Sequence, residues 1–250
     1  RSASTLATRT TTITRAAYAR EEPRHPRCAR LLRDTATEVN TVYVPVSAKD
    51  RILACARDIY LEQGLAGLSL RAVARCAGIT APAIYRHFDD KEDLLWAVCE
   101  RGHELFASYL ARGLKGATPR ERLVAAGMGY LDFALEHRPY YVIMFVAPPE
   151  HFGLDRLAER SADEGGVTFQ MLVDRVRECI DAGVLSRADP IAHAVVIWGH
   201  VHGLVALEQR LPRDPEARRV VAPPPIATDA QFRALYRSSI ESLLDGLAPR

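Results

Sequence analysis

The sequence predicts an all-α fold, and three observations support that prediction. From residue 48 onward, apolar side chains recur every three or four positions, which is the period of an amphipathic helix. Glycine and proline interrupt this pattern at helix-length intervals. No segment shows the alternation of apolar and polar residues that a half-buried strand needs.

Three short helices are expected at the start of the pattern. The first spans residues 47–63, ends at Gly64 and has its apolar face at Ile52, Ala56, Ile59 and Tyr60. Ser69 and Thr80 can cap the second and third helices, and Gly78 between them is free to take the positive φ of a tight turn. Two short helices around such a turn form a helix-turn-helix.

Longer helices follow, over about residues 90–114, 120–137, 169–180, 190–207 and 232–243. Asp89 or Asp90 can cap the first of these, and Pro190 suits the first position of the fourth. Residues 140–146 are expected to form only a brief turn, and residues 211–227, which hold five prolines, a loop.

Basic residues are concentrated at the amino end of a chain whose net charge is only +2. Residues 1–46 carry eight arginines against four acids, residues 49–91 carry seven bases against five acids, and the remainder is net acidic by four. A polyanion would therefore dock on the amino-terminal part. A hydrophobic content of 48% over 250 residues supplies a buried core for one or two domains.

Residues 1–46 are rich in Ser, Thr and Arg and lack a sustained apolar period, so we expect a disordered basic extension. A misassigned start codon, a targeting segment and a DNA-contacting arm are the alternatives. The apolar run 191–207 contains three histidines and is shorter than the ~20 residues of a membrane helix, so no membrane partner is predicted.

The five cysteines are an odd number with no C-x-x-C pair and no nearby histidine, so no structural zinc site is predicted. A reducing cytoplasm fits best, and a redox-sensing thiol is the alternative. His193, His200 and His202 lack a carboxylate or thiol at ligand spacing, so core histidines are preferred to a metal site. We predict no cofactor.

Residues 49–95 carry a specific set of short motifs, namely Leu68-Ser69-Leu70-Arg71, Ala77-Gly78-Ile79, Ile84-Tyr85-Arg86-His87-Phe88 and Lys91-Glu92-Asp93-Leu94. With Gly64 before them, these motifs resemble the DNA-binding domain of the tetracycline-repressor (TetR) family. The resemblance implies a bacterial one-component regulator with a three-helix DNA-binding domain over residues 47–92 and a larger helical effector-binding and dimerisation domain over residues 93–250.

The residues expected to contact double-stranded DNA are Ser69, Arg71, Thr80, Ala81, Pro82, Ala83, Tyr85, His87 and Lys91. The first turn of the third helix would meet base edges through the Thr80 hydroxyl and the alanine methyls, while Tyr85, His87 and Lys91 would hold phosphates. Family members often carry a polar or basic side chain at position 81, so methyl contacts and DNA shape are expected to count for more here. A capping role for Thr80 and core packing of Tyr85 are the alternatives.

The carboxy-terminal part resembles a TetR subtype marked by a Trp-x-x-x-His-Gly signature, here Trp198, His202 and Gly203. The helix over residues 190–207 is apolar on nearly every side, and a second copy of the chain is the economical cover. The predicted dimer interface consists of Val195, Gly199, Gly203, Leu207, Phe232, Leu235, Tyr236 and Leu243. Burial of the whole face within one chain is the alternative.

Aromatic and soft side chains gather on the middle helices and predict an apolar pocket for a small-molecule effector: Phe106, Tyr109, Tyr130, Phe133, Tyr141, Met144, Phe145, Phe169, Trp198 and His202. Plain core packing is the alternative for each of them. We find no nucleophile elbow, phosphate loop or H-E-x-x-H motif, so an enzyme is not predicted. The sequence thus favours a homodimeric cytoplasmic repressor released from a palindromic operator by an apolar or aromatic small molecule. An architectural or ligand-independent DNA-binding protein is the alternative, followed by a helical enzyme.

Overall fold

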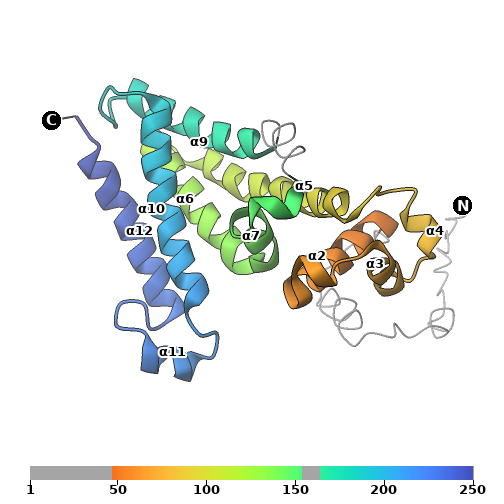
Figure 1. Ribbon diagram of the computed structural model, residues 1–250. Helices are drawn as coiled ribbons and strands as arrows, with labels where there is room; N and C mark the ends of the chain where they lie inside the picture. Colours follow the sequence, from red (N-terminus) through yellow and green to blue (C-terminus); the bar gives the residue numbers. More distant parts are fainter. Residues whose placement is uncertain (1–46, 154–163, 250) are drawn as a thin grey trace, which may run out of the picture.

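The computed structural model describes residues 47–153 and 164–249 and confirms the all-α prediction, because every regular element in these ranges is a helix (Figure 1). The predicted extension over residues 1–46 lies outside the described residues. Figure 1 shows α2, α3 and α4 at one end of the molecule and the remaining helices at the other.

The first three helices are α2 (Ala48–Gly67), α3 (Leu70–Ala77) and α4 (Ala81–Ile84), which we call the reading head. The Ser69 hydroxyl accepts a hydrogen bond from the Ala72 amide and caps α3. Gly78 (φ 68°) ends α3 in the left-handed conformation, as predicted, whereas Gly64 (φ 65°, ψ −168°) makes a kink inside α2, which continues to Gly67. The core of the reading head consists of Ile52, Ala56, Val73, Ala74, Ile84, Phe88 and Leu94.

A long helix, α5 (Lys91–Leu110), leaves the reading head and enters the larger part of the chain. Asp90 caps it through a 2.8 Å hydrogen bond from the Asp93 amide. The helix ends earlier than predicted and continues as the 3-10 turn η2 (Ala111–Lys115). After it come α6 (Pro119–Glu136), α7 (Arg138–Phe145) and η3 (Pro149–Phe152). The brief turn expected at residues 140–146 is instead part of the helix α7, because Pro139 lies in the first helical turn, where no amide donor is needed.

The remaining helices are α9 (Glu164–Asp181), α10 (Pro190–Arg210), α11 (Pro215–Val221) and α12 (Asp229–Gly246). Figure 1 shows α10 and α12 side by side at the end of the molecule farthest from the reading head. The loop predicted over residues 211–227 is wrong in part. Asp214 caps α11 and Pro215 occupies its first turn, so one of the five prolines expected to break helices begins one instead.

A buried ionic cluster holds α11 between α10 and α12. The Arg218 guanidinium lies 3.2 Å from the Glu208 carboxylate and 2.6 Å from the Asp229 carboxylate, and its Nε donates to the Ile226 carbonyl. Arg218 and Glu208 are both buried, so each charge needs the other.

Glycines allow α6 to approach its neighbours closely. Gly129 lies against the Tyr109 carbonyl of α5, and a Cβ added at Gly127 would lie 2.7 Å from Cδ1 of Ile240 on α12. The Tyr236 hydroxyl donates to the Gly127 carbonyl at 3.1 Å, which fixes the α6 and α12 pair.

Candidate functional site

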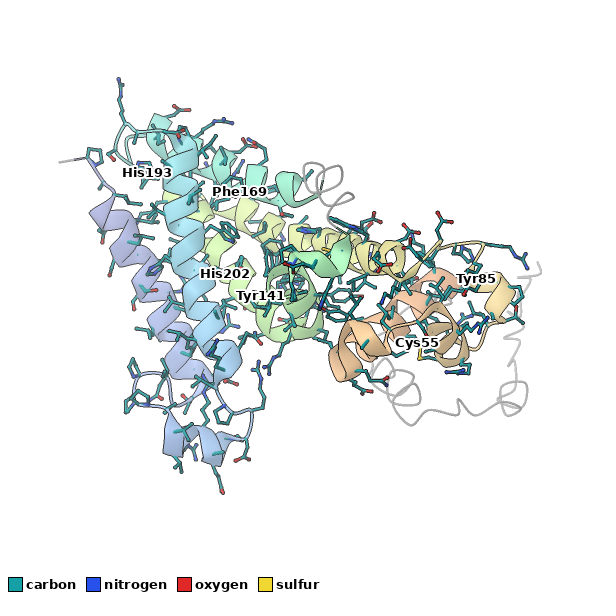
Figure 2. The ribbon with its side chains drawn as sticks, in the orientation of Figure 1. Cys55, Tyr85, Tyr141, Phe169, His193 and His202 are labelled. Atoms are coloured by element: carbon teal, nitrogen blue, oxygen red, sulfur yellow. A yellow bond between two sulfur atoms is a disulfide. The ribbon has the colours of Figure 1, made fainter. Side chains whose placement is uncertain are left out.

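The nine residues predicted to contact DNA lie together on α3, on α4 and its following turn, and at the start of α5. Thr80, Pro82, Tyr85 and His87 are exposed, and Figure 2 shows Tyr85 at the end of the molecule opposite α10 and α12. Thr80 precedes α4 without a side-chain capping hydrogen bond, so its hydroxyl is not committed to its own helix. Because Tyr85 is 51% exposed, core packing does not account for it.

Two exposed arginines beside these residues were missed by the sequence interpretation. Arg75 lies on α3, and Arg86 lies between Tyr85 and His87. Arg71 on α3 is also exposed, whereas Lys91, Ala81 and Ala83 are half-buried. The recurrence of arginine at four-residue spacing along α3 was the available signal, since it places both guanidiniums on one helix face.

A disulfide bond joins Cys55 on α2 to Cys76 on α3, with their Cα atoms 5.9 Å apart. The sequence interpretation treated all five cysteines as reduced thiols, and for this pair that expectation is wrong. The two cysteines are 21 residues apart in the sequence, and only the packing of α2 against α3 brings them together. The sequence pattern therefore did not predict the bond.

A cavity of about 640 Å³ lies between α5, α6, α9 and α10, and α7, η3 and α12 complete its wall. We call it the central cavity. Its rings cluster tightly, because the Phe106 ring centroid lies 5.2 Å from that of Tyr130 and 5.8 Å from that of Phe145. On the opposite wall the rings of Phe169 and Trp198 are 6.1 Å apart.

Six of the ten residues predicted for the pocket line the central cavity, namely Phe106, Tyr130, Met144, Phe145, Phe169 and Trp198. The other four, Tyr109, Phe133, Tyr141 and His202, are not among its lining residues. Tyr109 instead bonds to Glu136 and His137, and Phe133 is fully buried between α5 and α6. The sequence interpretation missed the α5 side chains that line the cavity, Trp96, Cys99, His103 and Leu110, although their spacing of three and four places them on one face of a helix.

His202 and two tyrosines form a polar network beside the central cavity, and Figure 2 shows His202 and Tyr141 close together. The hydroxyls of Tyr130 and Tyr141 lie 2.8 Å and 3.2 Å from Nδ1 of His202, so both are within hydrogen-bonding distance of it. Burial lowers the pKa of His202 and raises the pKa of Tyr141 to about 12, so the ring is neutral and the phenol keeps its proton at pH 7. The network therefore carries no charge and fixes the Tyr130 ring in the wall.

Two family models match the chain. Residues 52–98 match "Bacterial regulatory proteins, tetR family", and residues 123–220 match "Tetracyclin repressor-like, C-terminal domain". Together they cover more than half of the chain. The chain belongs to the TetR family of transcriptional regulators. The family is one of DNA-binding proteins with a helix-turn-helix, in agreement with the fold described above.

Two curated relatives are similar to the chain over part of their length. The HTH-type transcriptional activator FasR of Mycolicibacterium smegmatis is 30% identical over 90 residues, which is 36% of this chain and 41% of FasR. The HTH-type transcriptional repressor KstR2 of the same organism is 29% identical over 102 residues, or 40% of this chain and 49% of KstR2. The chain thus matches less than half of the length of each of these relatives.

Solved structures share the fold over most of the chain. A protein of unknown function from Rhodococcus sp. RHA1 superposes with a TM-score of 0.63 at 26% identity, covering 84% of this chain and all of that protein. The TetR family regulator PfmR from Thermus thermophilus superposes with a TM-score of 0.55 at 21% identity, covering 80% of this chain and all of PfmR. PfmR therefore supports the TetR fold alone.

Two side-chain contacts connect the reading head of this TetR-family chain to segments that line the central cavity, and a third contact joins one of these segments to α5. The Tyr60 hydroxyl of α2 lies 2.6 Å from Nδ1 of His151 in η3. The indole of Trp96, a cavity residue, donates to the carbonyl of Phe152, the last residue of η3 and also a cavity residue. The Arg57 guanidinium of α2 lies over the Tyr140 ring of α7, 5.2 Å from its centroid.

The outer side of α10 carries an apolar stripe at four-residue spacing, Ile191, Val195, Gly199, Gly203 and Leu207, which we call the α10 stripe. All five residues are exposed, and a Cβ added at either glycine would meet no atom within 4 Å. By length and composition α10 could span a membrane, and only 28% of its most apolar stretch is buried within the chain.

Phe232 and Tyr236, predicted as dimer contacts, are 2% and 0% exposed in the core of the chain, and that part of the prediction is wrong. Leu235 and Leu243 are half-buried beside them.

Proposed function

We propose that the chain is a homodimeric repressor that binds a palindromic DNA operator through its reading heads and releases it when an apolar small molecule fills the central cavity. The observation that carries this proposal is the cavity itself. Its volume of about 640 Å³ falls in the range of small-molecule sites, and its lining is predominantly apolar and aromatic. An architectural DNA binder has no use for such a space.

The exposed residues of the reading head support the DNA-binding half of the proposal. In a helix-turn-helix the second helix enters the major groove by its first turn, which here presents Thr80, Ala81 and Ala83. Exposed Arg71, Arg75 and Arg86 surround this turn, where phosphates would lie. Arg75 and Arg86 extend the predicted contact set.

The α10 stripe supports the homodimer. An exposed stripe of apolar side chains and two glycines lets a second α10 pack closely, and a two-fold pair of chains would present two reading heads to a palindromic site. The four side-chain positions Val195, Gly199, Gly203 and Leu207 remain in the proposed interface, with Leu235 and Leu243 of α12 at its border.

Trp198, His202 and Gly203 favour the subtype with the Trp-x-x-x-His-Gly signature. The matched carboxy-terminal model includes all three residues. Trp198 lines the central cavity, its ring lies 5.8 Å from that of His202, and Gly203 lies on the α10 stripe. A segment of about one and a half turns of α10 would thereby contact the ligand, take part in the polar network and contribute to the dimer interface.

Release is supported by the two side-chain contacts between the reading head and the segments of the cavity wall. A ligand shifts a conformational equilibrium only through its different affinities for the two states. Phe152, Met144 and Phe145 line the cavity, and the segments that carry them touch α2 through His151 and Tyr140. A ligand that displaces these rings would therefore move the reading head relative to α10.

The test begins with an operator selected from a randomised duplex pool by the purified protein. A thermal-shift screen of lipophilic and aromatic compounds should find stabilisers, and at least one should weaken operator binding in a fluorescence-anisotropy titration. If every stabiliser left the operator affinity unchanged, ligand-controlled release would be wrong. If the pool yielded no preferred sequence, specific operator binding would be wrong.

A further inference from the structure

We propose that Cys55 and Cys76 are an oxidant-sensing pair, whose disulfide bond is formed by exchange with a low-molecular-weight disulfide and raises the affinity of the reading head for its operator. The pair would give the protein a second input, separate from the central cavity. This inference rests on the operator binding proposed above.

The disulfide bond lies at the base of the turn that carries α4. Cys76 is in the last turn of α3, and only Ala77, Gly78 and Ile79 separate it from Thr80, which precedes α4. α4 has four residues, and a helix of that length is not stable on its own. Because the position of α4 therefore follows that of α3, a bond that fixes the end of α3 to α2 also fixes the first turn of α4.

The reading head can accommodate the two cysteines in either redox state. Besides the bond, α2 and α3 are held together by a shared apolar core that includes Ile52 and Ala56 of α2 and Val73 and Ala74 of α3. A buried thiol packs as a small apolar side chain in such a core. Reduction should therefore leave the fold in place and remove only the covalent constraint on α3, so that the pair can open and close within one fold.

Cys76 is the member of the pair that a dissolved reagent can reach. It is half-buried, whereas Cys55 is only 5% exposed. Cys179 of α9 differs from both, because burial raises the pKa of its thiol to about 11 and keeps it in the unreactive protonated form at pH 7. We therefore assign the first step of thiol–disulfide exchange to Cys76 and the second, resolving step to Cys55.

The charged residues around Cys76 favour exchange with an anionic reagent. Residues 69–88 include Arg71, Arg75 and Arg86 and no acidic residue. Arg71 and Arg75 are both exposed on α3, and Arg75 directly precedes Cys76. Nearby cations stabilise a thiolate, which is the species that attacks a disulfide. They also attract a reagent such as oxidised glutathione, which carries negatively charged carboxylates.

Two exchange steps form the bond from the reduced protein. The Cys76 thiol loses its proton and its sulfur attacks one sulfur of oxidised glutathione, so the S–S bond of the reagent breaks and one glutathione leaves as a thiolate that takes up a proton. The Cys55 thiol then loses its proton and its sulfur attacks the Cys76 sulfur, so the mixed disulfide breaks and the second glutathione leaves in the same way. In total, two protein thiols lose two electrons, and one glutathione disulfide is reduced to two thiols.

The bond should strengthen operator binding by preorganising the DNA contacts. Arg71 and Arg75 lie on α3 and Thr80 lies at the start of α4, so all three move with α3. A disulfide that restricts α3 before binding reduces the conformational entropy that is lost when these side chains are fixed on DNA. We expect the oxidised protein to bind the selected operator roughly fivefold more tightly than the reduced protein, which is an ordinary coupling between two sites.

The test measures operator affinity by fluorescence anisotropy on the full-length protein in buffers with different ratios of oxidised to reduced glutathione. Mass mapping of trapped thiols measures the fraction of protein that carries the bond. Because coupling is reciprocal, saturating operator should shift the glutathione ratio at half-oxidation toward the disulfide by the same factor of roughly five. Scrambled DNA at the same concentration is the control for this shift.

Cysteine variants show which thiols are responsible. The double variant with Cys55→Ala and Cys76→Ala should bind the operator with the affinity of the reduced protein in every buffer. Cys179→Ala and Cys28→Ser change cysteines outside the bond and should keep the full response. Circular dichroism melting in each buffer verifies that the reduced protein and the variants are folded at the assay temperature.

Several results would overturn the oxidant-sensing pair and leave the proposed operator binding in place. These are equal operator affinities in the two redox states, tighter binding by the reduced protein, and a bond that does not form in any glutathione buffer. A reduced protein that is unfolded at the assay temperature would also overturn the pair, because the bond would then be part of the fold. If the randomised pool yielded no preferred sequence, operator binding itself would be wrong and this inference would fail with it.

Discussion

The Tyr60 hydroxyl lies 2.6 Å from Nδ1 of His151, and this contact joins the helix α2 of the reading head to the segment that ends in the cavity residue Phe152. Burial raises the pKa of Tyr60, so the phenol keeps its proton and donates to the imidazole. The backbone of Phe152 in turn accepts from the Trp96 indole at 2.8 Å. One hydrogen bond thus joins the reading head to the segment that ends at the cavity, and a second holds that segment against α5.

Tyr60→Phe should weaken the communication between ligand and operator without weakening either site alone. The variant keeps the ring in the core and removes one hydrogen bond, worth about 0.5–1.5 kcal/mol. We expect the ligand-induced loss of operator affinity to shrink by roughly two- to tenfold, as measured by anisotropy with and without saturating ligand. His151→Asn, which retains an acceptor, should preserve more of the coupling than His151→Ala. An unaltered ratio in Tyr60→Phe would show that the signal passes elsewhere.

Thr80→Val should reduce affinity for the selected operator by about 1–3 kcal/mol and leave affinity for scrambled DNA nearly unchanged, because a base contact carries the sequence information. Since the Thr80 hydroxyl makes no capping hydrogen bond, the melting temperature should also stay the same. Titration of both duplexes and a melting curve measure these quantities. Equal losses on the two duplexes would show that Thr80 does not read sequence.

Lys91→Ala should weaken binding to the operator and to scrambled DNA by a similar factor. Lys91 opens α5, where its ammonium and the helix terminus can both face a phosphate. The dependence of log K on log salt should fall by about one unit per subunit. Titrations at four salt concentrations measure the slope. A slope equal to that of the unmodified protein would show that Lys91 does not contact a phosphate.

Gly203→Glu should convert the dimer to a monomer, because it places a charge on the α10 stripe where two helices would pair. Gly166→Glu is the matched control, since Gly166 also lies in a helix and has no atom within 4 Å of an added Cβ. Sedimentation velocity at micromolar concentration distinguishes the species. A monomeric unmodified protein would contradict the dimer, and dissociation of both variants would deny the stripe a specific role.

Reduction of the Cys55–Cys76 bond should lower the free energy of unfolding by about 3 kcal/mol, because the bond closes a loop of 21 residues in the unfolded chain. Urea unfolding with and without dithiothreitol measures the difference, and peptide mapping of the unreduced protein should recover the two linked peptides. Cys179→Ser, at a buried cysteine outside the bond, should keep the sensitivity to reductant. Identical unfolding curves with the bond present would contradict the loop-closure argument.

The reading head was predictable from the sequence because its signals are local. Ser69, Gly78 and Thr80 mark caps and a turn within a few residues, and the structure places each helix boundary within a few residues of that expectation. The cavity depends on contacts between distant segments. The aromatic residues of the sequence predicted most of the rings that line the cavity. They could not show that Phe106 lines it whereas Phe133 is buried, because that depends on which side of α6 packs against α5.

The polar contact between the cavity residues His103 and Thr168 was missed because they are isolated polar residues on two helices, 65 residues apart. Neither interrupts its helical pattern, and only the packing of α9 against α5 brings them together. Phe232 and Tyr236 illustrate the opposite error. From the sequence alone, an aromatic pair on the last helix is equally compatible with a dimer interface and with the core of the chain. In the structure α12 packs closely against Gly127 of α6, and this packing buries the pair in the core.

Because α5 is one continuous helix, a small rotation near the cavity displaces its first residues at the reading head. Its first residue, Lys91, belongs to the proposed phosphate contacts, and His103, twelve residues later, lines the cavity, about 18 Å away along the axis. A rotation of about 5° around the cavity would carry the start of the helix roughly 1.6 Å sideways. In a two-fold dimer the two displacements add to about 3 Å, close to the 3.4 Å step between neighbouring base pairs. In the proposed dimer, a small rotation of α5 at the cavity would therefore put the two reading heads out of register with one operator.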